Sequence, residues 1–395
     1  MILYTVQNGD TLYGIGKRYG IEPAILARDN GIAEPANLTV GQTLVLLQPR
    51  TVYTVAAGDT LYGVAQRFGV SVGDLWRNNL FLGGKTQLTA GQILNVVPEP
   101  TATQREFSVN AYVYDSVNRD LLQKMLPYLT YLTIFSYTVE EDGELLAPDD
   151  EALVEIARQY GVAPIMLVAS LNERGVFSTE LAETILGNRA VQDTLIAEIV
   201  NMLSRKRYAG VEVDFEYVPA ELDEEYVAFV RRLQERLSPL GYEVIVSLSP
   251  KTSSDQKGLL YEGHDYRGMG EAADGIFLMT YEWGYAYGPP MAVSPLDKVT
   301  GVVDYAVSQI PPSKILLGVP NYGYDWTLPY VRGGRAQSLG NAEAVRLAGE
   351  KKAEIRYDET SEAPFFRYFD RVGGSPVEHV VWFELLRMEI FQMQY

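Results

Sequence analysis

The sequence predicts an α/β chain in which two small βααβ modules precede a (β/α)8 barrel that lacks its eighth βα unit. Three observations lead to this fold class: an internal repeat near the N-terminus, a regular alternation of strand-length and helix-length segments after Phe107, and a strand with acids at every second position. The chain of 395 residues is long enough for two or three domains. The expected boundaries are residues 1–48 and 51–97 for the modules, 98–105 for a linker and 106–395 for the barrel.

The internal repeat reads YTVQNGDTLYGIGKRYGI from Tyr4 and YTVAAGDTLYGVAQRFGV from Tyr53. The match continues, because Asn30 aligns with Asn79 and the segment LTVGQTLVL aligns with LTAGQILNV. Each copy predicts a strand, a Gly-Asp turn, two helices and a closing strand. The prolines and threonines of VVPEPTATQREF, which has no apolar periodicity, then predict the linker.

Each Gly-Asp turn precedes an amphipathic run, so Asp10 and Asp59 are the predicted N-caps of the first helices. Both copies fit the signature YTVxxGDTLxxIAxxxxV…N…LxxGQxL and resemble LysM modules. The resemblance implies binding of N-acetylglucosamine-containing glycans, either peptidoglycan or chitin, between the loop after the first strand and the loop before the last. It assigns the groove to Gly9, Asp10, Thr11, Leu12, Asn37, Leu38, Gly58, Asp59, Thr60, Leu61, Gln87 and Leu88. The alternative interpretation is that GDTL is a capping turn and that its leucines belong to the core.

The alternation after Phe107 consists of apolar runs of strand length separated, for the most part, by amphipathic helical stretches such as DDEALVEIARQYG. The runs are FSVNAYVY, LTYLTIFSY, PIMLVAS, GVEVDFEYV, EVIVSLSP, GIFLMTY and KILLGVP. Such a pattern predicts a parallel sheet with helices outside it, and this number of units favours a TIM-type barrel over an open sheet.

The fourth run, GVEVDFEYV, places Glu212, Asp214 and Glu216 on one face of a strand and apolar residues on the other. In a barrel the apolar face packs under helices, and the acids point into the interior with Glu216 at the catalytic rim. Burial and mutual repulsion raise the pKa of at least one of them, as a general acid near neutral pH requires. The alternative interpretation is an edge strand with a solvated acidic face.

Residues 107–383 resemble glycoside hydrolase family 18, the chitinase-like barrels. The family motif DGxDxDxE reads AGVEVDFE here, with Ala209 in place of the first Asp and Glu212 in place of the second. The segment LMTYEWG is similar to the family's MxYD on the sixth strand, with Glu282 in place of Asp. GVPNYGYDW resembles the seventh-strand segment, and LSPKTSS follows the fifth strand.

The resemblance implies retaining catalysis in which the substrate's own 2-acetamido oxygen attacks the anomeric carbon. Glu216 then protonates the leaving oxygen and activates water, Asp214 holds the acetamido N–H, and Tyr281 donates to the acetamido carbonyl. Glu212 is expected to share a proton with Asp214. The other assigned positions are the supporting acid Glu282 and the sugar-binding rings Trp283, Tyr322 and Trp326. The alternatives are packing for Tyr281 and the tryptophans, and a solvated rim acid for Glu282.

The C-terminal part departs from the family pattern. Residues 324–383 predict a small α+β insertion after the seventh strand. The family continues after VWFE with a helix and an eighth strand that ends in a tryptophan, whereas this chain reads VWFELLRMEIFQMQY. Trp382 belongs to the preceding strand, so the sequence predicts a barrel that is open by one βα unit and exposes two edges.

Composition limits the function classes. The net charge of −18 argues against nucleic acid and anionic membranes as partners, and no apolar run approaches the roughly 20 residues of a membrane helix. The absence of cysteine and the presence of only His264 and His379 exclude thiolate and histidine-rich metal sites, and no metal or organic cofactor is implied. The chemistry is therefore expected to be carboxylate chemistry, and the 27 tyrosines and four tryptophans suit stacking on sugars.

Two LysM modules with this barrel most resemble the spore cortex-lytic N-acetylglucosaminidases and spore germination hydrolases of bacilli. The resemblance implies hydrolysis of peptidoglycan β-1,4 bonds after N-acetylglucosamine, and a place on the spore surface or in the cortex, associated with the cell wall. The N-terminus shows no secretory signal, which is consistent with assembly from the mother cell. The alternatives are a non-catalytic glycan-binding protein, such as a chitinase-like lectin or spore-coat component, and a chitinase. The sequence predicts no oligomeric state.

Overall fold

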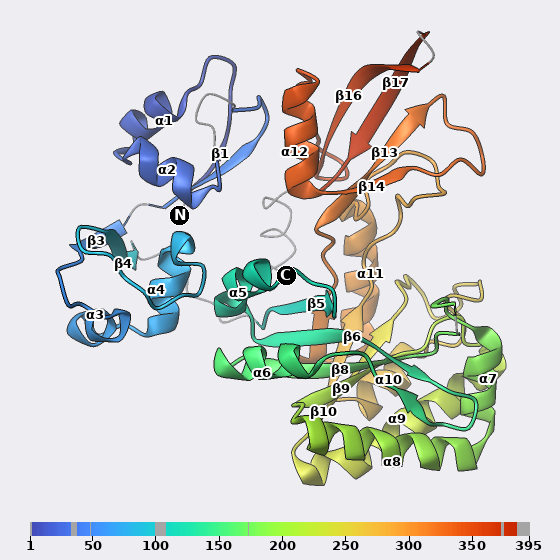
Figure 1. Ribbon diagram of the computed structural model, residues 1–395. Coiled ribbons are helices and arrows are strands. Elements are labelled where there is room, and N and C mark those ends of the chain that lie inside the picture. The colour runs from blue at the N-terminus through green and yellow to red at the C-terminus, as the bar shows by residue number, and fades with distance from the viewer. Residues whose placement is uncertain are drawn as a thin grey trace. The chain divides into compact units, whose positions relative to one another are not determined.

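A computed structural model describes residues 2–32, 38–47, 49–98, 108–172, 174–372 and 375–384 (Figure 1). The chain forms two compact units. One comprises Met1–Phe107, Tyr281–Val299 and Val319–Tyr395, and the other comprises Ser108–Thr280 and Thr300–Gly318. Outside the described residues lie Asn37, the predicted linker beyond its first residue, and the C-terminal segment 385–395.

Both predicted βααβ modules form, each as two helices with an antiparallel pair of strands. The first module contains β1 (Ile2–Thr5), α1 (Leu12–Tyr19), α2 (Pro23–Asp29) and β2 (Thr43–Leu46). The second contains β3 (Pro49–Thr54), α3 (Leu61–Phe68), α4 (Val72–Asn78), the 3-10 turn η1 (Leu80–Leu82) and β4 (Ile93–Pro98). Each module encloses an apolar core of its own, centred on Ile15 and Leu26 in the first and on Leu75 and Leu94 in the second.

The N-caps of α1 and α3 lie one residue later than the sequence predicts. Thr11 and Thr60 are the caps, and their hydroxyls accept hydrogen bonds of 3.0 Å from the backbone N–H groups of Gly14 and Gly63. The prediction of Asp10 and Asp59 as caps is wrong because their carboxylates are already engaged by donors nearer the preceding strand.

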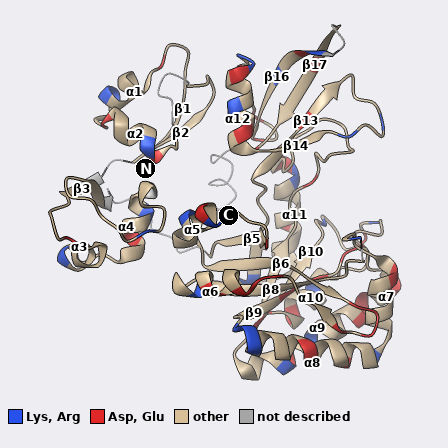
Figure 2. Cartoon of the chain, in the orientation of Figure 1, with Lys and Arg blue, Asp and Glu red and all other residues tan. Residues whose placement is uncertain are grey.

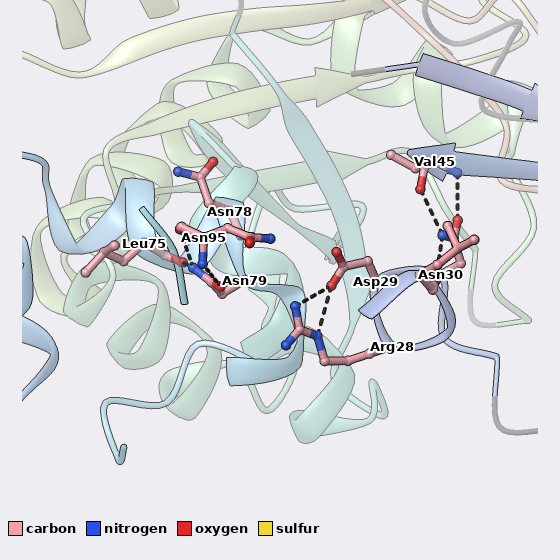
Figure 3. A network of polar contacts seen from close by, with 9 residues as sticks. Arg28, Asp29, Asn30, Val45, Leu75, Asn78, Asn79 and Asn95 are labelled. Atoms are coloured by element: carbon pink, nitrogen blue, oxygen red, sulfur yellow. Dashed lines mark hydrogen bonds and ion pairs between the residues drawn. The ribbon is translucent and has the colours of Figure 1, made fainter. Parts of the chain in front are cut away.

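The aligned asparagines close each module in the same way (Figure 3). Asn30 donates to the carbonyls of Leu26 and Val45 at 2.9 Å and accepts the Val45 N–H at 2.7 Å. Asn79 makes the matching bonds to Leu75 and Asn95, each at 2.8 Å. One side chain therefore ties the end of the second helix to the closing strand, which explains why the repeat keeps an asparagine here.

The second unit is built on the predicted parallel sheet, in the order β12-β11-β10-β9-β8-β6-β5, with β7 added antiparallel to β6. The strands are β5 (Asn110–Tyr114), β6 (Tyr131–Val139), β7 (Leu145–Leu146), β8 (Ala163–Ala169), β9 (Gly210–Asp214), β10 (Glu243–Leu248), β11 (Gly275–Leu278) and β12 (Ile315–Leu317). All seven predicted strand runs are thus strands of one sheet, and the α/β class is confirmed.

Helices connect the strands and cover the outer face of the sheet, with α6 packed on β8, α9 on β10 and α10 on β11 (Figure 1). They are α5 (Arg119–Met125), α6 (Glu151–Gln159), α7 (Thr179–Gly187), α8 (Arg189–Lys206), α9 (Asp223–Leu237), α10 (Tyr266–Ala272) and α11 (Leu296–Gln309). Short 3-10 turns are η2 (Leu126–Tyr128), η3 (Ala220–Leu222), η4 (Ser238–Leu240) and η5 (Pro312–Lys314). Acidic and basic positions occur together on an outer helix such as α8 (Figure 2).

The sheet curls but does not close within the described residues. Tyr112 of β5 and Phe277 of β11 are separated by four strands in the sheet order, yet their ring centroids lie 5.0 Å apart. This contact requires the sheet to bend round on itself. Among the described strands β5 and β12 are the two ends, with no pairing between them, as expected for a barrel without its eighth unit.

The predicted insertion forms a five-stranded antiparallel sheet in the order β14-β13-β17-β16-β15 with one helix. Its elements are β13 (Tyr322–Leu328), β14 (Gln337–Gly340), α12 (Asn341–Glu350), β15 (Arg356–Asp358), β16 (Ala363–Val372) and β17 (Ser375–Trp382). GVPNYGYDW is therefore divided, because β12 ends at Leu317 and the YGYDW part begins the antiparallel sheet. Trp382 belongs to this sheet and stacks on Phe365 at 4.7 Å.

Candidate active site

The alternation in GVEVDFEYV directs its side chains as the sequence predicts. Phe215 stacks on the rings of Tyr226 and Phe229 of α9, at centroid distances of 5.7 and 5.9 Å, so the apolar face packs under a helix. Glu212 points the other way and meets side chains from strands across the curled sheet. Because β9 lies between β8 and β10, the interpretation as a solvated edge strand is excluded.

Glu212 is fully buried and surrounded by hydroxyl groups. Its Oε1 accepts hydrogen bonds from Tyr112 at 2.6 Å and from Ser247 at 2.7 Å, and its Oε2 accepts one from Thr133 at 3.3 Å. Burial raises the pKa of Glu212, and the three hydroxyl donors oppose that rise. These donors come from β5, β10 and β6, so Glu212 ties three strands to β9 from inside the sheet.

Asp214 ends β9 and is only 6% exposed. Its Oδ1 is buried and has no hydrogen-bond partner among the described residues. Burial, followed by repulsion from Glu216 and Glu212, raises its pKa well above the ordinary value. A buried carboxyl oxygen without a donor is costly in the free protein, and a ligand N–H would remove that cost.

Glu216 follows the end of β9 and is partly exposed. Burial raises the pKa of its carboxyl to about 7. A carboxylic acid with this pKa holds its proton in a large fraction of molecules near neutral pH and also loses it readily. It can therefore serve as a general acid and then as a general base.

Sequence reasoning missed the partners that hold these acids. Tyr112, Thr133 and Ser247 surround Glu212, and His264 accepts the backbone N–H of Ser249 and contacts the carbonyl oxygen of Phe215 at 3.0 Å. The three hydroxyl residues lie on β5, β6 and β10, and only the curl of the sheet brings them together. His264 lies in a loop without periodicity, so no sequence signal marks it.

In the other unit, three of the predicted aromatic positions, Tyr281, Tyr322 and Trp326, belong to one cluster with Val293 and Tyr324. Tyr281 and Tyr322 are partly buried at its margin. Trp326 is 2% exposed and donates its ring N–H to the Gly288 carbonyl at 2.9 Å. The prediction of Trp326 as a sugar platform is therefore wrong, because the antiparallel sheet encloses its ring.

Glu282 is exposed in the left-handed region, with φ at 65°. It accepts hydrogen bonds from the hydroxyls of Tyr322 at 2.5 Å and Tyr324 at 2.8 Å. Burial and the Glu282 charge raise the pKa of both tyrosines. Glu282 thus orients two aromatic side chains. Trp283, the neighbouring residue, is partly buried.

The predicted LysM groove positions differ in accessibility. Leu12 and Leu61 are 2% and 1% exposed and belong to the module cores, so their assignment as glycan contacts is corrected to packing. Gln87 is exposed and Leu38 and Leu88 are partly buried, so they can meet a ligand, whereas Asn37 lies outside the described residues.

The turn residues Gly9 and Gly58 adopt φ values of 85° and 88°, a conformation that favours glycine. Beside them, Asp10 accepts from the hydroxyl of Tyr4 at 2.5 Å and from the Gln7 N–H at 2.8 Å. Asp59 accepts at the same distances from Tyr53 and Ala56. In both modules the tyrosine hydroxyl is the main cause of the lowered pKa of the aspartate.

Within the described ranges, no group of three or more His, Cys, Asp or Glu side chains is arranged to hold a metal ion. Of the helices that are described, none has the length and apolar character needed to cross a membrane.

Comparison with known proteins agrees with these features. The family model described as Glycosyl hydrolases family 18 matches residues 111–385, and the LysM domain model matches residues 4–46 and 53–97. A protein of Bacillus subtilis (strain 168) named cortical fragment-lytic enzyme is 38% identical over 391 residues, covering 97% of this chain and 89% of that protein. A protein of Bacillus anthracis with the same name is 39% identical over 397 residues, covering 97% of this chain and 89% of that protein. The crystal structure of the Bacillus megaterium QM B1551 spore cortex-lytic enzyme SleL gives a TM-score of 0.82 at 38% identity, covering 99% of this chain and 90% of that chain.

Proposed function

The chain belongs to glycosyl hydrolases family 18 and carries two LysM domains, and from this premise we propose that it hydrolyses spore cortex peptidoglycan at β-1,4 bonds after N-acetylglucosamine. The observation that carries the proposal is the pair of carboxyls at the end of β9, the buried Asp214 and the partly exposed Glu216, whose pKa values are both raised. The names of its relatives, a cortical fragment-lytic and a spore cortex-lytic enzyme, support cortex peptidoglycan as the substrate.

In the proposed mechanism the 2-acetamido oxygen of the substrate attacks the anomeric carbon, so the enzyme supplies no nucleophilic carboxylate. Glu216 donates its proton to the leaving oxygen and later accepts a proton from the water that completes hydrolysis. Asp214 accepts the acetamido N–H at its unpartnered Oδ1 and so orients the attacking oxygen. Tyr281 donates its hydroxyl to the acetamido carbonyl, an assignment that rests on its place in LMTYEWG.

The other residues have supporting roles in the proposal. Glu212 holds the interior of the sheet through its three hydroxyl donors and, by its charge, helps to raise the pKa of Asp214. Glu282 orients the Tyr322 ring, and Trp283 and Tyr322 contribute to sugar binding. The LysM domains anchor the enzyme to N-acetylglucosamine-containing glycan, which places it in the cortex or at the spore surface.

The proposed division of the chain assigns residues 1–48 and 51–97 to the LysM domains, 98–105 to a linker and 106–395 to the hydrolase domain. The ranges matched by the two family models support the LysM and hydrolase parts of this division.

Digestion of purified cortex peptidoglycan by the full chain, followed by reductive labelling of new ends, tests the proposal. The expected products carry N-acetylglucosamine at the new reducing end. Glu216→Gln is expected to lower the rate by about 10²–10⁴-fold, because the neutral amide cannot transfer a proton. Glu224→Gln, on the exposed first turn of α9, is the matched control and keeps full activity. New ends on muramic acid, or normal activity of Glu216→Gln, would contradict the proposal.

A further inference from the structure

His264 lies in the loop between β10 and α10 and is only 1% exposed. Its Nδ1 lies 2.9 Å from the backbone nitrogen of Ser249, and its Nε2 lies 3.0 Å from the carbonyl oxygen of Phe215. The Ser249 N–H can only donate, so Nδ1 must accept. A carbonyl oxygen can only accept, so Nε2 must carry the proton. These two contacts fix a neutral ring in a single tautomer.

The groups around the ring hold this state. The Lys251 ammonium donates to the His264 backbone carbonyl at 3.0 Å, and burial together with the Lys251 charge lowers the pKa of His264 to about 4. The Tyr266 hydroxyl donates to the Ser249 carbonyl at 2.7 Å, and the Tyr226 ring lies 6.0 Å away. The remaining titratable groups on the neighbouring segments are Asp214 and Glu216 beside Phe215, and Asp223, Lys257, Glu262 and Asp265 near Lys251.

Phe215 lies between the two proposed catalytic acids, Asp214 and Glu216, in the sequence. The strand β9 ends at Asp214, so the sheet does not set the backbone beyond it. Tyr217 then turns the chain with φ at 55°, in the left-handed region. The ring of Phe215 stacks on two rings of α9, and its carbonyl oxygen accepts a hydrogen bond from His264. His264 therefore holds the backbone at Phe215, and the orientation of that backbone sets the directions of the Asp214 and Glu216 carboxyls.

We propose that His264 is a positioning residue for the hydrolysis, which bridges the ends of β9 and β10 and holds the carboxyls of Asp214 and Glu216 in their working geometry. This inference rests on the proposed function and deepens it. It extends the catalytic apparatus beyond the acids on β9 to a side chain from the following βα loop that touches neither the substrate nor the acids themselves.

The test compares His264→Phe, which fills the space without either hydrogen bond, with His264→Gln, which keeps one donor and one acceptor. Activity on N-acetylglucosamine oligomers is measured per folded molecule, with folding checked by near-UV circular dichroism. His264→Phe is expected to lower kcat on the order of 10–100-fold with little change in KM, because displaced catalytic groups lose rate more than binding. His264→Gln is expected to recover part of that loss.

A pH profile separates positioning from a merely structural role. In His264→Phe the alkaline limb of kcat is expected to move to lower pH, because a loosened segment lets water reach Glu216. His379→Phe, a change of the other histidine, on β17, serves as control and should leave kcat and the profile unchanged. Unchanged kcat and profile in folded His264→Phe would overturn the inference, whereas a wild-type chain that cuts no substrate would overturn the proposed function instead.

Nitrogen-15 NMR of the labelled full chain gives a readout that does not depend on activity. The His264 ring is expected to stay neutral, with its proton on Nε2, from about pH 5.5 to pH 8. A ring that becomes charged within this range, or that carries its proton on Nδ1, would overturn the inference.

Discussion

Asp10 and Asp59 of the LysM domains and Asp214 and Glu216 at the end of β9 all carry carboxyl groups, yet their environments shift their pKa values in opposite directions. Asp10 and Asp59 each accept a tyrosine hydroxyl and a backbone N–H, and these donors lower the pKa. Asp214 is buried and Glu216 is partly exposed, and the loss of water around each carboxyl raises its pKa. Hydrogen-bond donors favour the charged form, whereas loss of water favours the neutral form.

The direction of the pKa shift determines whether a carboxyl group serves as a permanently ionised hydrogen-bond acceptor or can transfer a proton near neutral pH. Asp10 and Asp59 each connect a strand to the turn before a helix, and their lowered pKa keeps them ionised at neutral pH. The buried Oδ1 of Asp214, by contrast, has no hydrogen-bond donor among the described residues. A site that is incomplete in the free protein is consistent with one that a substrate completes.

After the loss of activity in Glu216→Gln, the largest expected effect is that of Asp214→Asn. The amide keeps the size of the side chain but loses the ability to hold the acetamido N–H as an anion. We expect kcat to fall by about 10²–10³-fold, as for the loss of a group that stabilises charge in the transition state. Steady-state kinetics on N-acetylglucosamine oligomers measures this loss. Asp223→Asn on α9 is the matched control, and an equal loss in both variants would refute a specific role for Asp214.

Glu216→Gln tests how much the raised pKa of Glu216 lowers the stability of the folded protein at alkaline pH. Because the folded pKa of about 7 lies above the ordinary value of 4.5, folding favours the protonated form, and stability is lost as pH rises from about 4.5 to about 7. The amide never ionises, so the variant should melt at a higher temperature than the wild type at pH 8. At pH 4 their melting temperatures should agree. Thermal unfolding at both pH values measures this, and a wild-type advantage at pH 8 would contradict the account.

Substitution of the aligned asparagines compares the stability of the two LysM domains. Asn79 is fully buried and Asn30 is partly buried, although their hydrogen bonds match. Asn79→Ala leaves buried backbone groups without partners and should destabilise the second domain by about 2–4 kcal/mol. Asn30→Ala should cost less, because water can replace part of what is lost. Denaturant unfolding measures both, and equal costs would show that burial does not distinguish the domains.

The smallest effect is expected at the helix caps. Thr11→Ala and Thr60→Ala each remove one hydroxyl acceptor and should lower the free energy of unfolding by about 1 kcal/mol, equally in the two domains.

Asp10 and Asp59, beside these caps, contribute stability that is present above the ordinary aspartate pKa and is lost as pH falls through the lowered pKa. Acid titration followed by tryptophan fluorescence of Trp76 reports the second domain, and unfolding above pH 5 would contradict this assignment.

Regular patterns made much of the architecture predictable. The repeat aligned Asn30 with Asn79, and the strand runs gave the whole parallel sheet, because periodicity reports which face is buried. The alternation in β9 directed Glu212 inward and Phe215 outward in the same way. The helix caps were misplaced by one residue, because a tyrosine from the preceding strand competes for each aspartate.

The contacts that depend on tertiary packing could not be predicted. Trp326 is buried because the insertion forms a larger antiparallel sheet than its sequence suggested. The donors around Glu212 come together only because the sheet curls, and His264 reaches Phe215 from a loop many residues away. None of these follows from local propensity, because each requires segments distant in sequence to meet.

Loss of water around its carboxyl makes Glu216 the acid of the proposed reaction. The pH dependence of kcat/KM for hydrolysis of N-acetylglucosamine oligomers, measured from about pH 4 to pH 9, tests it most directly. Activity is expected to fall above about pH 7 as Glu216 loses its proton. An alkaline limb near the ordinary glutamate value of 4.5, or constant activity up to pH 9, would contradict it.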